Sequence, residues 1–151
     1  MSPRALVVAA LALAAGCGGG APEPVDIDTR NDACAWCRMA ISDVRFAAQI
    51  VAPREEPHLF DDIGCLRDWL AGGAQHREGA VAWVADHRTR AWVRATDATY
   101  ARVPGLATPM ASGLVAHASA ASRAGDADAA GGASLTVREV FGDTHVPGGG
   151  G

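Results

Sequence analysis

The fold is decided by residues 45–73, which read RFAAQIVAPREEPHLFDDIGCLRDWLAGG. Residues 45–52 have the composition of a strand, and residues 58–60 form a short returning strand after a polar turn. Two aspartates then offer N-cap carboxylates to a helix that runs to about Ala71 and ends at two glycines. Apolar residues recur at helical spacing along this helix and form its buried face: Ile63, Leu66 and Leu70.

The rest of the chain continues this order of elements. Residues 80–85 are typical of a buried strand and complete a β-β-α-β unit. A fainter second unit has strands over 91–94, 99–103 and 112–118, an Ala-rich helix over 119–130 and a closing strand over 134–137. Gly125 weakens that helix by about 1 kcal/mol relative to Ala. We therefore expect an α+β fold of two small β-β-α-β units, at about 32–86 and 90–142, that share one core.

The N-terminus has the features of an export signal. Residues 5–15 form an apolar run after Arg4, too short for the ~20 residues that a membrane-spanning helix needs but typical of a signal peptide. The run leads through small residues into Cys17, as in bacterial lipoprotein signals, where cleavage precedes a cysteine that is then acylated. An ordinary secretory signal with a chance cysteine is the alternative. We expect a signal peptide over 1–16, a lipid-anchored flexible linker over 17–31, a folded domain over 32–142 and a disordered tail over 143–151.

Composition excludes one class of partner. The 151 residues carry a formal charge of −4, with 13 Arg and no Lys against 17 acids. Hydrophobic residues make up 49%, enough for a core, but aromatic residues only 5%. An acidic chain with few aromatic side chains lacks both the phosphate-binding charge and the stacking surface of nucleic-acid-binding proteins.

The cysteine count predicts a free thiol. Beyond Cys17 the chain has Cys34, Cys37 and Cys65. Exported proteins usually pair their cysteines, and three cannot all pair within one chain. A thiol left over in such a protein indicates a function.

A sulfur-rich motif begins at Cys34. Cys34 and Cys37 form Cys-x-x-Cys, which alone fits zinc, copper or redox chemistry. Met39 adds a thioether, and thiolate with thioether is the donor set that favours Cu(I). A structural zinc site requires four cysteine or histidine donors, and there is no second Cys-x-x-Cys in the sequence to supply them.

Two interpretations remain open for each of two further sulfur-containing residues. Met110 follows Pro109 in a predicted turn, where it is either a ligand or a residue that fills a gap under a loop. Cys65 is either a small buried residue or a thiolate stabilised by the helix N-terminus, an effect that Asp61 and Asp62 oppose.

The remaining candidate ligands carry weaker signals. His58 lies near the two aspartates and is able to approach a metal bound there. The other histidines are scattered without ligand spacing, and each is expected to be a surface or hydrogen-bonded residue: His76, His87, His117 and His145. The paired aspartates resemble an acid/base site, but a helix cap and its neighbour is the favoured interpretation, because carboxylates are poor ligands for Cu(I).

Taken in order, these motifs resemble the NosL family. The resemblance covers roughly residues 32–118 and rests on Cys-x-x-Cys-x-Met at 34–39, Phe-Ala-Ala-Gln-Ile at 46–50, Phe-Asp-Asp-Ile-Gly-Cys at 60–65, Trp-Val-x-Asp at 83–86, Ala-x-Tyr at 98–100 and Thr-Pro-Met-x-Ser-Gly-Leu-Val-Ala at 108–116. It implies two β-β-α-β units related to a domain of organomercurial lyase. It also implies a periplasmic lipoprotein that binds Cu(I) and supplies copper for the maturation of nitrous oxide reductase. Arg38 and Ala111 depart from the family pattern, because both positions usually carry Gly.

We therefore expect a copper chaperone rather than an enzyme. The expected Cu(I) ligands are Cys34, Cys37, Met39, Met110 and Cys65, and the expected lipidation site is Cys17. The expected partner is a copper-accepting enzyme or its assembly machinery, with nitrous oxide reductase implied by the resemblance. We expect the protein to lie on the periplasmic side of a bacterial membrane, to which the N-terminal lipid anchors it. The expected membrane is the outer membrane. A thiol-disulfide oxidoreductase that uses Cys34 and Cys37 is the main alternative, followed by an enzyme similar to organomercurial lyase.

Overall fold

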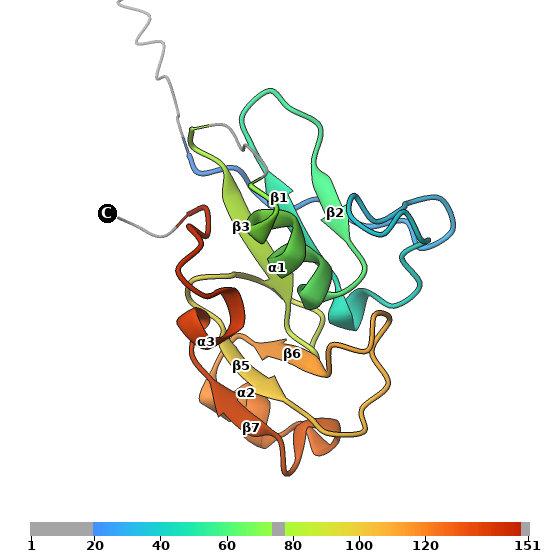
Figure 1. Ribbon diagram of the computed structural model, residues 1–151, viewed down its shortest axis with the longest axis vertical. Helices are drawn as coiled ribbons and strands as arrows, with labels where there is room; N and C mark the ends of the chain where they lie inside the picture. Colours follow the sequence, from blue (N-terminus) through green and yellow to red (C-terminus); the bar gives the residue numbers. More distant parts are fainter. Residues whose placement is uncertain (1–19, 74–77, 149–151) are drawn as a thin grey trace, which may run out of the picture.

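The computed structural model describes residues 20–73 and 78–148, which form two antiparallel sheets with helices packed against them (Figure 1). This confirms the α+β class. The expected signal peptide, Cys17 and His76 lie outside the described residues. No helix within the described ranges is both long and apolar enough to span a membrane.

The first sheet has the strand order β2-β1-β3-β4 and is covered on one face by the helix α1. Its elements are β1 (Ala48–Val51), β2 (His58–Phe60), α1 (Ile63–Ala71), β3 (Val81–Ala85) and β4 (Trp92–Arg94), preceded by the 3-10 turn η1 (Val44–Phe46). β1 lies at the centre, where Gln49 pairs with Leu59 of β2 and with Trp83 of β3. All four residues of β1 are buried.

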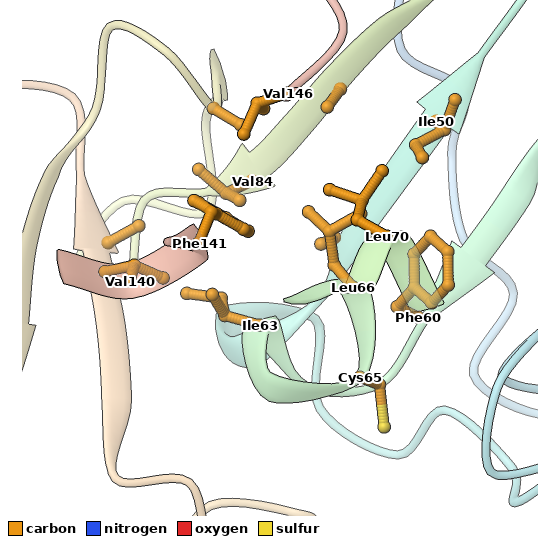
Figure 2. Packing of buried hydrophobic residues seen from close by; sticks show 14 of the residues in the cluster. Ile50, Phe60, Ile63, Cys65, Leu66, Leu70, Val84, Val140, Phe141 and Val146 are labelled. Carbon is orange, nitrogen blue, oxygen red and sulfur yellow. The ribbon is translucent and has the colours of Figure 1, made fainter. Parts of the chain in front are cut away.

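The helix α1 forms where the sequence predicts it. Asp62 is its N-cap, and the carboxylate accepts a hydrogen bond from the Gly64 N–H at 2.6 Å. Leu66 and Leu70 pack with Phe60 between the helix and the sheet (Figure 2). Figure 2 also shows that the sulfur of Cys65 points away from these side chains.

The second sheet has the order β6-β5-β7 and is formed by the C-terminal part of the chain. Its elements are β5 (Thr99–Arg102), β6 (Leu114–His117), α2 (Ala120–Ala124), the 3-10 turn η2 (Ala127–Ala129), β7 (Ala133–Leu135) and α3 (Val137–Phe141). Val140 and Phe141 of α3 reach the core of the first unit, so the two units share one core as expected (Figure 2).

The two sheets are joined at Asp86, which follows β3. Asp86 forms an isolated parallel bridge with Ala116 of β6, and the His87 N–H donates to the Ala116 carbonyl at 2.8 Å. The Asp86 carboxylate accepts hydrogen bonds from the N–H groups of Ala118, Thr89 and Arg88 at 2.7, 2.9 and 3.0 Å. Burial disfavours its charge, but the hydrogen bonds outweigh burial and lower the pKa of Asp86 to about 2. This carboxylate therefore fixes the turn between the sheets.

Several elements differ from the sequence prediction. β4 extends the first sheet, so the division between the sheets falls after Arg94 rather than at about residue 90. The predicted continuous helix over 119–130 is wrong: it divides into α2 and η2, because Asp126 adopts an extended backbone conformation and caps η2. A helix, α3, begins at Val137, where a strand was predicted to end.

Both ends of the domain pack further than expected. Upstream, Val25 lies within the predicted flexible linker, yet its backbone N–H and carbonyl are hydrogen-bonded by the buried Gln49 amide at 2.8 and 3.0 Å. Downstream, Val146 is buried and the Ala82 N–H donates to the Pro147 carbonyl at 3.0 Å, so the predicted disordered tail is ordered along β3 up to Gly148. The buried amide and the valine are the contacts that hold the two ends.

Candidate metal centre

Three cysteines from two separate segments converge on Asp61. Cys34 and Cys37 lie in the loop before β1, Asp61 follows β2, and Cys65 lies in the first turn of α1. One donor atom from each of these four residues lies within 4.8 Å of the others. We call this group the sulfur cluster.

Backbone hydrogen bonds shape the cysteine loop. The Cys34 N–H donates to the Met39 carbonyl at 2.8 Å, and the Arg38 N–H donates to the Cys34 carbonyl at 3.1 Å. Arg38 has a φ of 67° in this tight turn, the left-handed region that favours glycine. The Ala35 N–H donates to the Leu59 carbonyl at 2.7 Å and docks the loop on the edge strand β2. The motif spacing therefore places both thiols beside the residue that follows this strand.

The three thiols are free and differ in their acidity. A hydrogen bond from the Cys65 thiol stabilises the Cys34 thiolate and, against the effect of burial, lowers the pKa of Cys34 to about 6. Donating to Cys34, together with burial, raises the pKa of Cys65. Burial and the neighbouring negative charges raise the pKa of Cys37. At neutral pH the cluster therefore holds one thiolate and two thiols.

Asp61 is the member of the cluster that sequence reasoning missed. Its side chain is buried, and both carboxylate oxygens lie 3.6 Å from the Cys37 sulfur, which donates to them. As expected of a helix cap and its neighbour, Asp62 caps α1 and Asp61 does not, but the contact of Asp61 with Cys37 was not predicted. Two consecutive residues cannot both occupy one N-cap position, and this was the available signal that Asp61 has another role.

The two methionines lie on the loops that border the sulfur cluster, with exposed side chains. Met39 is 56% exposed and Met110 is 42% exposed. The Met110 N–H donates to the second carboxylate oxygen of Asp62 at 2.9 Å, so one side chain both caps α1 and holds the Met110 turn. Gly64 permits this approach, because a Cβ there would lie 2.9 Å from the Ser112 Cβ.

Ala111, next to Met110, has a φ of 55°. Arg38 and Ala111 are the two positions at which the sequence resemblance led us to expect Gly. Both are in the left-handed region, where a Cβ is unfavourable. The departures therefore place strain beside the sulfur cluster while leaving every sulfur atom in place.

The histidines do not enter the sulfur cluster in the described part of the chain. His58 packs its ring against Trp69 at 5.0 Å between centroids. His87 and His117 were expected to be surface or hydrogen-bonded residues, and both are buried and hydrogen-bonded to Asp126. Each also retains a ring nitrogen without a hydrogen-bond partner among the described residues. They form a separate group with Asp126.

This arrangement is suited to a soft metal ion. Thiolate sulfur is the donor that selects Cu(I), zinc and iron–sulfur clusters, and thioether sulfur shifts the preference towards Cu(I). The structure brings Cys34, Cys37 and Cys65 together as potential ligands and adds the carboxylate of Asp61.

The comparisons with known proteins agree with this chemistry. The NosL family model matches residues 24–144, most of the chain. No curated protein and no solved structure gave a significant match. The matched range begins beside Val25, the residue held by Gln49, and ends within the packed C-terminal segment. The chain belongs to the NosL family.

Proposed function

We propose that this protein is a copper chaperone, which binds Cu(I) through cysteine and methionine sulfur and delivers it to a copper enzyme. The observation that carries the proposal is the convergence of three thiols at one buried point. Membership of the NosL family supports a copper-binding accessory role. The family resemblance further indicates nitrous oxide reductase, or its assembly machinery, as the acceptor.

The donor atoms explain why the ion would be monovalent. Cu(I) is soft and takes low coordination by thiolate and thioether, whereas hard divalent ions prefer oxygen. Because its pKa is about 6, Cys34 is already a thiolate at neutral pH, and Cu(I) does not have to displace a proton into the solvent to bind it. A second cysteine completes the core of the site, and the thioethers of Met39 and Met110 are the proposed outer donors.

The differences in burial suggest how the ion is released. Cys34 and Cys65 are only 1% and 2% exposed, while Cys37 is half-buried and both methionines are exposed. An acceptor can reach the exposed donors first and replace them one at a time, so the ion never has to leave into water. We therefore propose that copper leaves by ligand exchange on the methionine side.

We also propose that the protein is exported and lipid-anchored through Cys17 on the periplasmic side of the outer membrane. The small-residue run into Cys17 supports this. Replacement Cys17→Ser should move the protein out of the membrane fraction and abolish fatty-acid labelling. A wild-type protein that is fully soluble and carries no fatty acid would contradict the proposed anchor.

The alternative, a thiol-disulfide oxidoreductase, fits the geometry less well. The attacking cysteine of such an enzyme must combine a low pKa with access to the substrate. Here Cys34 has the low pKa and is buried, whereas the more exposed Cys37 has a raised pKa. The two requirements fall on different residues, and the alternative gives no function to the methionines.

The experiment is an anaerobic competition titration of reduced protein with Cu(I) and a chromophoric Cu(I) chelator. We expect one bound Cu(I), weakened most by Cys34→Ser and by roughly tenfold, or 1.4 kcal/mol, in Met110→Leu. The leucine keeps the volume and removes only the sulfur, and Leu106→Ala serves as a control at a neighbouring apolar site. Unchanged affinity in the combined Met39→Leu and Met110→Leu variant would refute methionine ligation.

Delivery requires a second step. Protein loaded with one Cu(I) is mixed with copper-free nitrous oxide reductase across a dialysis membrane and, in parallel, in direct contact. We expect copper transfer only with contact. Equal transfer in both arrangements would mean that the ion dissociates freely, which would contradict the chaperone proposal.

A further inference from the structure

A second group of potential ligands lies in the interior, apart from the sulfur cluster. His87 follows β3, His117 ends β6, and Asp126 caps η2. The group therefore combines one residue of the first unit with two of the second. All three side chains are buried, with exposed fractions of 1%, 0% and 6%.

Both imidazole rings converge on a single oxygen. His87 Nδ1 lies 2.6 Å and His117 Nε2 lies 2.8 Å from the same Asp126 Oδ2. One donor atom from each residue lies within 4.8 Å of the other two. The His87 ring is held by Phe46, at 5.0 Å between centroids, and by the backbone hydrogen bond of His87 to Ala116.

Hydrogen bonding alone leaves this group incomplete. The second nitrogen of each ring, Nε2 of His87 and Nδ1 of His117, is buried without a partner among the described residues. Buried polar atoms are nearly always paired, because an unpaired one loses its hydration without compensation. Two apolar residues would fill the same space without that cost. Packing alone therefore does not account for two imidazole rings directed at one carboxylate. An ion bound by Nδ1 of His87 and Nε2 of His117 would leave the second nitrogens unpaired, so the convergence on Asp126 is the observation that indicates a metal site.

We propose that His87, His117 and Asp126 form a second metal site, which binds a borderline divalent transition-metal ion of the zinc class. Two imidazole nitrogens and one carboxylate oxygen are a recurrent donor set for such ions and a poor one for Cu(I). With metal–ligand distances of about 2.1 Å, tetrahedral donors lie roughly 3.4 Å apart. Asp126 Oδ2, now 2.6 and 2.8 Å from the two ring nitrogens, must therefore withdraw by about 0.6–0.8 Å. The sulfur cluster and this group share no residue, so the two sites select different ions.

The surroundings of Asp126 allow this shift. A cavity of about 250 Å³ is lined by His87 and Asp126 and gives a path for the ion and room for a water molecule as the fourth ligand. Arg45, Arg88 and Arg90 also line it. The Arg45 guanidinium lies 2.7 Å from the Asp43 carboxylate and 3.6 Å from that of Asp128, so part of the positive charge at the rim is balanced.

A bound ion would connect the two β-β-α-β units through side chains. The ion binds the folded chain, in which the three ligands meet, and not the unfolded one, so it should stabilise the fold in proportion to its free concentration. Thermal stability therefore reports binding of this ion independently of copper delivery. Free Zn²⁺ at a hundredfold excess over Kd should raise Tm by about 5–10 °C.

The test uses the whole mature protein with its sulfur cluster already filled by Cu(I) under anaerobic conditions. Zn²⁺ or Co²⁺ is then added, excess ion is removed by gel filtration, and bound metal is counted. We expect one additional ion per chain and a Co²⁺ spectrum without sulfur-to-metal charge-transfer bands. No additional ion, or charge-transfer bands that show cysteine ligation, would overturn the proposal.

Matched variants identify the ligands. His87→Asn and His117→Gln place an amide N–H at about the position of the ring N–H that donates to Asp126, but an amide nitrogen does not ligate the ion. Each should weaken Zn²⁺ binding at least a hundredfold and leave Cu(I) binding unchanged, whereas His58→Asn should change neither. Wild-type Zn²⁺ affinity in both variants would overturn the proposal. If neither variant folds, the metal count and the Co²⁺ spectrum of the wild-type protein decide it.

Discussion

Replacing Asp62 with Asn should separate the two interactions of one carboxylate. Its Oδ1 accepts from the Gly64 N–H at 2.6 Å and caps α1, while Oδ2 accepts from the Met110 N–H at 2.9 Å. An amide oxygen can accept in only one of these places, and the amide nitrogen cannot accept at all. Asn is as good an N-cap as Asp, and the cap bond is the shorter and fully buried one. Asp62→Asn should therefore keep the helix capped and release the Met110 turn.

The expected magnitudes follow from these contacts. A hydrogen bond to a charged group contributes about 1.5–3 kcal/mol, and the half-exposed Met110 turn can exchange this one for water, so we expect a loss of about 1–2 kcal/mol in the free energy of unfolding. Once the turn is free, the Met110 backbone is no longer held beside the N-terminus of α1, and the proposed thioether donor loses its fixed position. Cu(I) affinity should then fall roughly tenfold, to the level of Met110→Leu.

A double-mutant cycle gives the decisive comparison. Wild type, Asp62→Asn, Met110→Leu and the double variant are unfolded in urea with tryptophan fluorescence as the probe, and their Cu(I) affinities are measured by competition. The two substitutions should be non-additive in affinity, because both remove the same donor. If Asp62 affected Cu(I) affinity only through its charge, Asp62→Asn would also lower the affinity in the Met110→Leu background. Additive losses, or a less stable Asp62→Asn protein with wild-type affinity, would refute the reasoning.

Three further expectations concern strain, protons and acid stability. Arg38→Gly and Ala111→Gly should each raise the free energy of unfolding by about 0.5–1 kcal/mol in urea, because φ values of 67° and 55° disfavour a Cβ; a decrease at both positions would contradict this. Because the pKa of Cys34 is about 6 and that of Cys37 is raised, Cu(I) binding to both at pH 7.5 should release one proton rather than two. Affinity should therefore rise about tenfold per pH unit above pH 6 and more steeply below it, and competition titrations that show no pH dependence would exclude thiol ligation. The pKa of Asp86 is about 2 in the folded protein, below its ordinary value of 3.8, so the stability it contributes is complete above about pH 5 and is lost as the pH falls through 2; urea unfolding across this range should show a smaller acid-induced loss in Asp86→Asn than in wild type.

The first unit was predictable because its signals are local. The strand His58–Phe60 has the expected bounds, and α1 ends at Ala71 with its N-cap at Asp62, as the aspartates and glycines indicated. The spacing of Leu66 and Leu70 gave the buried face directly. In this stretch the local preference and the tertiary packing agree.

The second unit was predicted less well, because tertiary contacts override local preference there. Ala-rich residues favour a continuous helix over 119–130, but Asp126 leaves the helix to bind two histidines. The missed helix α3 did carry a local signal. Thr136 and Glu139 form a capping box, which a Thr-x-x-Glu pattern indicates.

The sequence predicted the three cysteines of the sulfur cluster but not its carboxylate, Asp61. Cys-x-x-Cys spacing indicates that Cys34 and Cys37 meet, but only the family resemblance connected Cys65 to them. Asp61 was interpreted only as the neighbour of the helix cap, because carboxylates are poor ligands for Cu(I). The histidine group gave no sequence signal, because His87 and Asp126 are 39 residues apart and carry no motif spacing.

The most direct test of copper binding by sulfur is the X-ray absorption spectrum at the copper edge of protein loaded with one Cu(I). We predict a first shell of sulfur alone, with one sulfur fewer in Met110→Leu and a loss of ordered binding in Cys34→Ser. A shell dominated by nitrogen or oxygen, unchanged in both variants, would contradict it and would place the copper away from the cysteines.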